Sequence, residues 1–361
     1  MEGAIMSSKH FSTSRRSFLK QSAGISLASL AGVALPRMVY SASRDRITIL
    51  TSVSLDTLHP YAYTSAPQYS LWMHMIQPLV DIDYSKKQYV GVLAESWEFQ
   101  GNKWTFKLRK NVRFHDGSPF TAKDVIHSIN RVKNDKQSMQ GPAFSDLVEM
   151  QSPDDHTVVF TTKQPNAVFL DRLDNRFMIS KAAADKHGEQ ADQNPLGTGP
   201  YKFVSWQRDG NLVLSRNDDY WGPKAAIKEI VIKRVKEDAA RVAGVMAGQG
   251  DVMNNVPVEE LSRFDKHPRL RAEKVEGQRM YFLAMNVTHK PFDSKLVRQA
   301  INYAVDPNAI IKHIYEGNGY LMNGPTGTNV IGFDPKINAT RSIRRKPKSC
   351  SHRQVFPTAS K

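Results

Sequence analysis

The alternation of apolar and polar side chains predicts several strands along the chain. In the stretch 104–114, WTFKLRKNVRF, the apolar residues Trp104, Phe106 and Leu108 occupy every second position. Because a strand directs alternate side chains to one face, this pattern indicates a strand that is buried on one side. Short apolar or alternating runs predict four more strands, at 47–54, 156–162, 211–217 and 229–235.

A helical period follows the alternating stretch. In TAKDVIHSINRV, residues 121–132, Thr121 can cap the helix, and Asp124 three residues later completes a capping box. The apolar residues of this segment share one helical face. They are Val125, Ile126, Ile129 and Val132.

Two helices are predicted in succession near the end of the chain. The first covers 293–305, DSKLVRQAINYAV. In the second, Asp306 caps the helix, Pro307 takes the first helical position and Gly317 ends it. Strands and helices that are mixed at this density indicate an α/β fold.

The net charge of +15 is concentrated at the two ends of the chain. Residues 1–43 carry a net charge of +4 and residues 340–361 carry +7, which leaves +4 for the long segment between them. A nucleic-acid-binding protein carries its basic patch on the folded surface, so this placement argues against nucleic acid as a partner. The single cysteine, Cys350, excludes a disulfide framework or a cysteine-based metal site.

The N-terminus has the features of an export signal. Arg15 and Arg16 are followed by Phe18, a lysine and a short apolar run rich in Ala, Gly and Ser. This pattern is typical of a twin-arginine signal, and the small residues at 41–43 suit cleavage by signal peptidase. We therefore expect residues 1–43 to be a signal peptide and the protein to be periplasmic, in a Gram-negative bacterium.

Candidate catalytic and cofactor motifs have simpler explanations. His115 and Asp116 are adjacent in FHDGSPF, where Asp-Gly and the following proline predict a turn, and no nucleophile elbow is present. GTGPYKF at 197–203 lacks the spacing of a dinucleotide or phosphate loop. The Met, His and Met residues of WMHM, 72–75, would point to different faces of a helix. We expect no catalytic residue, cofactor or metal site, although the Tyr-rich loop 57–69 suits a binding wall.

Four blocks of the sequence carry a common resemblance. The first, LAESWEFQGNKWTFKLRKNVRFHDGSPFTAKDVIHSINRV, covers 93–132, and the others cover 196–222, 244–264 and 280–311. In this order the four blocks resemble one family, the family 5 extracytoplasmic solute-binding proteins of ABC transporters, which includes dipeptide-, oligopeptide- and nickel-binding proteins.

The resemblance implies a two-lobed periplasmic binding protein of type II, with an inserted subdomain in its first lobe. By position, the first lobe would be 44–277, the insertion about 81–195 and the incomplete start of the second lobe 278–338, with the crossing near Gln278–Asn286. Such a protein is a monomer that catalyses nothing. It is exported by the twin-arginine translocase and hands its ligand to a membrane permease that a separate ATPase powers.

The resemblance also places ten residues along the cleft between the lobes. Of these, an arginine would suit a carboxylate or another anionic group of the ligand. The ten are Tyr61, Tyr63, Tyr69, Asn175, Arg176, Met253, Asn254, Asn255, Met285 and Asn286.

Beyond the last block the chain departs from the family pattern. Family members continue into a helix similar to KAKELLAEAGFPDG, whereas GFDPKINAT is followed here by a basic run. A nucleotide string that encodes residues 341–360 of this chain, when read two bases later, encodes FDPTKAKELLAPAGFPDGK. We therefore expect a frameshift near Asn338–Ala339 and an aberrant, disordered tail at 339–361. Sequencing the gene across codons 330–345 would test it.

Three functions remain open from the sequence. Peptide capture for ABC import is the first, and a nickel chelate, an opine or a sugar-like solute is the alternative ligand class within the family. A secreted hydrolase is the alternative of another class, and it would need a nucleophile constellation that the sequence does not show.

Overall fold

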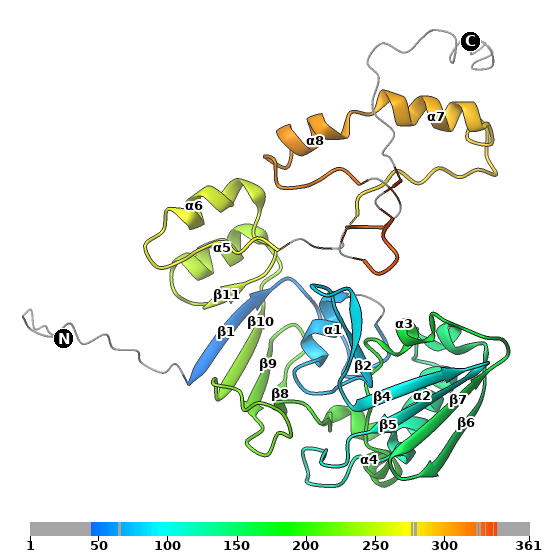
Figure 1. The fold of residues 1–361 in the computed structure, drawn as a ribbon. Coiled ribbons are helices and arrows are strands. Elements are labelled where there is room, and N and C mark those ends of the chain that lie inside the picture. Colours follow the sequence, from blue (N-terminus) through cyan, green and yellow to red (C-terminus); the bar gives the residue numbers. More distant parts are fainter. Residues whose placement is uncertain are drawn as a thin grey trace, which may run out of the picture. The chain divides into compact units, whose positions relative to one another are not determined.

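The computed structural model describes residues 45–63, 66–275, 277, 280–322, 324, 326–328, 330–334 and 336–337 (Figure 1). These all belong to one unit of the chain. The predicted export signal, with Arg15, Arg16 and Phe18, lies outside the described residues. The predicted frameshift site and tail also lie outside them.

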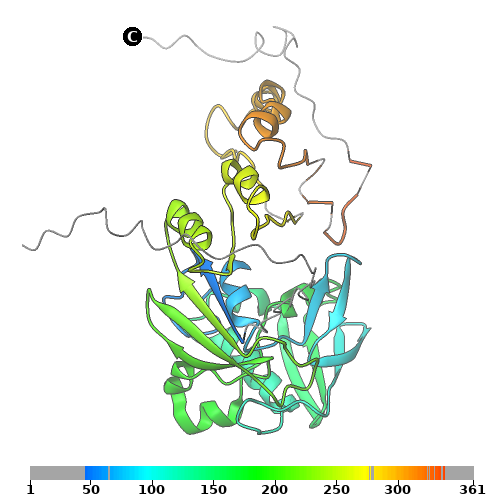
Figure 2. The ribbon, with the colours of Figure 1, turned by 90° about the vertical axis from the view of Figure 1, so that its left-hand side faces the viewer.

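The first sheet has five strands and joins segments that are far apart in sequence. Its order is β11-β1-β10-β9-β8, and β1 pairs in parallel with both β10 and β11. Strands β10, β9 and β8 are successively antiparallel. Figures 1 and 2 show β1 (blue) beside the green strands of this sheet. The bounds are β1 Arg46–Thr51, β8 Tyr201–Trp206, β9 Asn211–Arg216, β10 Glu229–Arg234 and β11 Val252–Met253.

The second sheet has four antiparallel strands in the order β4-β5-β7-β6. Trp104, Phe106 and Leu108 are all buried, which confirms the predicted one-sided strand. That strand ends at Leu108, however, and not at residue 114. A turn follows Leu108, and the Val112 carbonyl then accepts a hydrogen bond from the N–H of Phe120. The bounds are β4 Ala94–Gln100, β5 Lys103–Leu108, β6 Leu147–Asp154 and β7 Thr157–Thr162.

Helix α2, Ala122–Asn134, packs against β6 and β7 and begins with the predicted capping box. The Thr121 backbone N–H donates to Asp124 Oδ2 at 2.8 Å, and its hydroxyl lies 3.0 Å from the same oxygen. The other carboxylate oxygen of Asp124 accepts from the N–H of Lys181 at 2.9 Å. The cap therefore also fixes the start of α4, Lys181–His187.

The remaining elements are short, and one predicted boundary is wrong. Helix α8, Pro307–His313, is capped by Asp306 as predicted, but it ends four residues before Gly317, whose φ of +80° belongs to the turn beyond. No helix among the described residues has the length and apolar character needed to cross a bilayer. The other bounds are α1 Ala66–Trp72, β2 Val80–Asp83, β3 Gln88–Gly91, α3 Phe169–Leu173, α5 Asp238–Met246, α6 Leu261–Asp265 and α7 Lys295–Ala304. Short 3₁₀ turns cover Gly141–Phe144, Gly188–Gln193 and Val258–Glu260.

One hydrophobic cluster joins the two sheets, and a smaller one covers the start of the first sheet. The large cluster includes Trp104 and Phe160 of the second sheet together with Leu214 and Ile232 of the first. The smaller cluster packs Leu50 of β1 against residues of α5 and α6. Strand β1 is therefore central, with paired edges and a packed environment.

The turn at His115 is structural, as the sequence indicated. Its Nε2 donates to the carbonyl of Gly199 at 3.1 Å, and its Nδ1 accepts from the N–H of Gly197 at 3.4 Å. This pattern requires a neutral ring with its proton on Nε2. Burial lowers the pKa of His115 to about 4, although the Gly199 carbonyl partly opposes the shift. The ring thus holds the GTG segment in place.

A neutral His115 predicts loss of stability in acid. The imidazole of His115 is protonated near pH 6.5 in the unfolded chain but only near pH 4 in the folded chain. The neutral ring therefore contributes fully to the free energy of unfolding above pH 6.5, and this contribution is lost as the pH falls toward 4. We expect this histidine to lower the free energy of unfolding by up to about 3 kcal/mol between pH 7 and pH 4. Urea unfolding at both pH values would measure it. His115→Gln should flatten the pH dependence, the exposed control His187→Gln should not, and equal slopes in the two variants would contradict the assignment.

Candidate functional site

The Tyr-rich segment leaves the carboxyl end of β1 and is tied to a distant loop. Tyr61 is completely buried, and its hydroxyl donates to the carbonyl of Phe177 at 2.7 Å. Burial raises the pKa of this phenol. Tyr61 thus supports the wall from within, and its direct contact with a ligand stays a prediction.

Tyr63 is half-buried and Tyr69 is buried, and the two lie in the same Tyr-rich segment. The Tyr63 hydroxyl accepts from the N–H groups of Asp56 and Thr57, at 2.8 and 2.9 Å, and lies 2.9 Å from the Thr57 carbonyl. The Tyr69 hydroxyl donates to the Tyr63 carbonyl at 3.0 Å, and its ring meets Phe177 edge-on at 6.1 Å. The structure therefore brings all three tyrosines together around one loop.

The segment 174–176 lies against these tyrosines and contains a residue that the sequence did not single out. Asn175 has a φ of +56°, and its amide donates to the Asp174 carboxylate at 2.8 Å. Burial and the nearby Asp81 carboxylate raise the pKa of Asp174 above its usual range. Asp174 Oδ1 and Arg176 Nε are buried without a hydrogen-bond partner. One carboxylate oxygen and one guanidinium nitrogen near Tyr69 are thus without a hydrogen-bond partner, although both side chains make other hydrogen bonds.

The segment 253–255 begins with Met253, the last residue of β11, and leaves the same sheet edge as the tyrosine loop. Met253 is paired with Leu50 of β1 and packs against the smaller hydrophobic cluster. Asn254 Oδ1 is buried without a partner, and Asn255 has a φ of +54°. Since β1 and β11 are parallel, the segments that follow them share one edge of the sheet, where open α/β sheets bind ligands.

Met285 and Asn286 are the last two of the ten predicted cleft residues. Among the described residues, no hydrogen bond or ring contact links them to the tyrosine loop or to the segments 174–176 and 253–255. Met285 is half-buried, while Asn286 is exposed and its side-chain oxygen accepts from the N–H of Thr288 at 3.0 Å. Residues 280–285, which belong to the predicted crossing between the lobes, have no secondary structure. A strand needs a partner, and no described segment pairs with this one.

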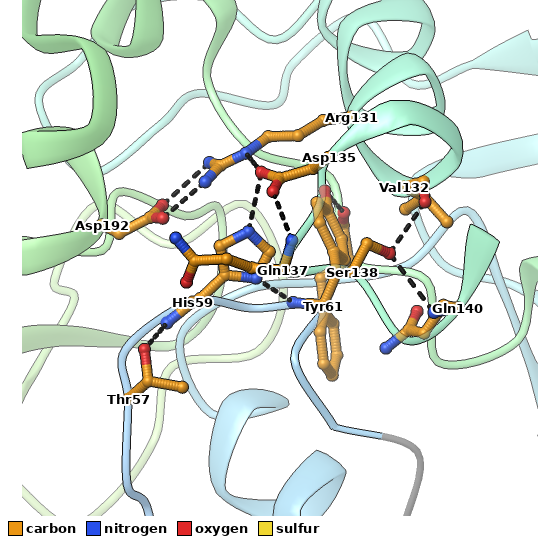
Figure 3. A network of polar contacts seen from close by, with 11 residues as sticks. Thr57, His59, Tyr61, Arg131, Val132, Asp135, Gln137, Ser138, Gln140 and Asp192 are labelled. Atoms are coloured by element: carbon orange, nitrogen blue, oxygen red, sulfur yellow. Dashed lines mark hydrogen bonds and ion pairs between the residues drawn. The ribbon is translucent and has the colours of Figure 1, made fainter.

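A charged network holds the start of the tyrosine loop in place (Figure 3). His59 Nε2 lies 2.9 Å from Asp135 Oδ2, and Arg131 Nε lies 3.1 Å from the same oxygen. Both terminal nitrogens of Arg131 bond to the Asp192 carboxylate. Burial alone would raise the pKa of Asp135, but hydrogen bonds from His59, the Gln137 N–H and Arg131 lower it to about 2. The loop is therefore preorganised by α2 and by the turn at 188–193.

The described residues offer an aromatic wall, and two small cavities are found elsewhere in the same unit. The two described cavities each hold about 20 Å³, which suits one water molecule. Among the described residues, no group of three or more His, Cys, Asp or Glu side chains is placed to hold a metal ion. An aromatic wall with a few convergent polar groups can bind one side of a small solute.

The sequence profile of one family matches residues 88–348, and its description is "Bacterial extracellular solute-binding proteins, family 5 Middle". The match covers most of the chain. The chain belongs to this family. The resemblance inferred from the four sequence blocks is therefore confirmed.

Relatives of known name support the family 5 assignment. The chain is 30% identical over 318 residues to the "Probable D,D-dipeptide-binding periplasmic protein DdpA" of Escherichia coli (strain K12). This match covers 84% of the chain and 60% of that relative. The chain thus spans about three-fifths of the length of the E. coli protein that it matches.

Two solved structures support the fold. The ABC transporter-associated periplasmic binding protein DppA from Helicobacter pylori, in complex with peptide STSA, matches with a TM-score of 0.72 and 28% identity. The match covers 82% of this chain and 63% of that one. AgaA from A. tumefacien R10, in complex with agropinic acid, matches with a TM-score of 0.71 and 26% identity, over 82% and 61% of the two chains. The predicted α/β fold of the type II periplasmic binding proteins is confirmed.

Proposed function

We propose that this chain is the periplasmic solute-capturing component of an ABC import system, with peptides as the ligand class. The observation that supports it best is that the buried Tyr69 links two partly exposed residues, Tyr63 and Arg176, next to the segment that leaves β1. An arginine suits the carboxylate of a peptide, and tyrosines suit its apolar side chains. The family 5 profile and the peptide complex of the H. pylori relative agree with this choice.

The proposal includes the division into lobes. The first lobe covers 44–277, with an inserted subdomain at about 81–195, and the second begins at 278. The second sheet, β4 to β7, falls wholly within the inserted range, and the first sheet falls wholly outside it, which supports the division. Binding energy then closes the lobes around the solute, and a permease with a separate ATPase receives it. No catalytic step is involved.

A second ligand class is supported by one comparison. The A. tumefacien structure holds agropinic acid and matches this chain about as well as the peptide complex does. An acidic opine would also place a carboxylate on Arg176. Nickel chelates and sugar-like solutes remain alternatives within the family.

Thermal unfolding with a solute panel separates these classes. The panel contains di- and tripeptides, opines, nickel–histidine and sugars, and is applied to the chain as it stands and to one whose reading frame is restored beyond Asn338. Because a cleft needs both walls, we expect peptides to raise the melting temperature of the restored chain by several degrees, about 2–3 kcal/mol at saturating solute, and to affect the present chain little. An opine-only response would replace the peptide proposal, and turnover of any peptide or ester would contradict a purely binding role.

A further inference from the structure

Two carboxyl groups from distant parts of the chain meet next to Arg176. Asp81 belongs to β2, and Asp174 caps the end of α3, where its N–H donates to the Leu170 carbonyl at 3.0 Å. The two carboxyl groups are hydrogen-bonded to each other, and both side chains are partly buried. Two ionised carboxylates can only accept hydrogen bonds, so this contact requires a proton on one of them.

The surroundings of Asp174 favour its protonated form. Its Oδ2 accepts from the Asn175 amide at 2.8 Å, whereas its Oδ1 is buried and has no partner in the described part of the chain. The carbonyl groups at the carboxyl end of α3 also disfavour a negative charge there. Burial and the Asp81 carboxylate accordingly raise the pKa of Asp174, against the opposing effect of Arg176. A proton on Oδ1 would give this oxygen the partner that it lacks.

The ionisable groups that face Asp174 come from β2, β3, α1 and α3 and from its own segment. They are Asp81, Tyr89, Tyr69, Asp171 and Arg176. Tyr89 donates to the Asp171 carboxylate, and burial together with this hydrogen bond raises the pKa of the phenol, which therefore keeps its proton. Arg176 supplies the one positive charge among these five groups. The charge of Asp174 therefore decides how far the charge of Arg176 is compensated.

Arg176 joins the acid pair to the tyrosine loop. Its Nη1 donates to the Asp174 carbonyl at 3.5 Å, and its guanidinium is hydrogen-bonded to the Tyr69 hydroxyl. That hydroxyl donates in turn to the Tyr63 carbonyl at 3.0 Å. A change of charge at Asp174 therefore acts directly on the residue to which the proposed function assigns the anionic group of the solute.

We propose that Asp81 and Asp174 hold one proton between them, and that this proton controls the binding of an anionic solute group by Arg176, an inference that rests on the proposed function. While the proton is held, the pair carries one negative charge and Arg176 is free to bind the anion. As the pH rises, the proton passes to water, and the second carboxylate attracts Arg176 and repels the anion. Capture of an anionic solute is therefore stronger at low pH and weaker at high pH.

A titration of the full chain tests the shared proton without any solute. The carboxyl carbons of the aspartates are followed by ¹³C NMR between pH 4 and pH 9, together with the Nε–H signal of Arg176. We expect one aspartate to titrate well above the usual range of this side chain, with the Arg176 signal following the same midpoint. Both changes should vanish in Asp174→Asn, and the midpoint should fall in Asp81→Asn. Asp155→Asn, at a side chain that is 63% exposed, is the control and should change neither.

Two results of this titration would overturn the proposal. In the first, every aspartate of the unaltered chain titrates within the usual range, a result that depends on no variant. In the second, the raised midpoint is the same in Asp81→Asn as in the unaltered chain, so that the proton is not shared.

A carboxylate probe tests the control over Arg176. Trifluoroacetate stays ionised throughout this pH range, so its own charge does not change. We expect its affinity, read from the shift of the Arg176 Nε–H signal, to be on the order of fivefold higher at pH 5 than at pH 8. Asp174→Asn should abolish this difference and Asp155→Asn should preserve it. Equal affinities at the two pH values, or no response of Arg176 at either, would overturn the proposed control. If the response appears but no peptide of the solute panel binds, the peptide proposal fails and the role of the acid pair is still supported.

Discussion

Replacing Gly197 by alanine is expected to destabilise the protein by about 3 kcal/mol. A Cβ at this position would overlap the carbonyl oxygen of Met75 and would lie 2.8 Å from Ile76 Cγ1. The Met75 oxygen is a backbone atom that accepts a hydrogen bond from the N–H of Gly199 at 2.8 Å. It cannot move aside without breaking that hydrogen bond. Chemical denaturation of the purified variant measures the loss.

Gly101→Ala is the matched control for this effect. Gly101 has a φ of +62° and open space around the added carbon, so only backbone strain of about 1 kcal/mol is expected there. Equal losses in the two variants would show that the close contact at Gly197 is not the cause. The comparison therefore separates steric overlap from the conformational preference of glycine.

Arg131→Leu is expected to cost about 3 kcal/mol and to loosen the tyrosine loop. The carboxylates of Asp135 and Asp192 are only 21% and 16% exposed, so removing the arginine leaves two largely buried charges with fewer partners. His59, which is bonded to Asp135, holds the loop that leads to Tyr61 and Tyr63. Urea unfolding measures the stability, and amide exchange in 57–63 measures the loosening.

Two further variants identify the origin of that loss. Lys123→Ala breaks an ion pair whose side chains are 70% and 63% exposed, so it should change stability by less than about 1 kcal/mol. Adding Asp192→Leu to Arg131→Leu removes one of the unpaired charges and should restore part of the stability. A double variant that is no more stable than Arg131→Leu would contradict the role of buried charge.

Local patterns in the sequence predicted the elements that depend on neighbouring residues. The capping box of Thr121 and Asp124 and the alternation through Trp104 and Phe106 need only a few consecutive residues, and the structure confirms both. The end of α8 was misplaced because Gly317 marks a later turn and not the last helical residue.

Long-range features were beyond the reach of such patterns. The network of His59, Arg131, Asp135 and Asp192 comes from three separate segments, and nothing in their spacing indicates that they meet. Asp174 was missed because its significance depends on burial and on the distant Asp81. The sequence signal for Asp174 was its position next to Asn175 and Arg176, two residues that the family resemblance places along the cleft.

The pairing of β1 has a consequence for the order of events during synthesis. Arg46 and Glu229 are register partners, and Leu50 pairs with Met253 on the other side. Strand β1, the first of the described strands to leave the ribosome, must therefore remain unpaired until most of the described chain has been made, which delays folding and exposes an apolar edge for that time. A chaperone that protects β1 of the nascent chain would be most useful in this interval, and its help would end once β10 emerges.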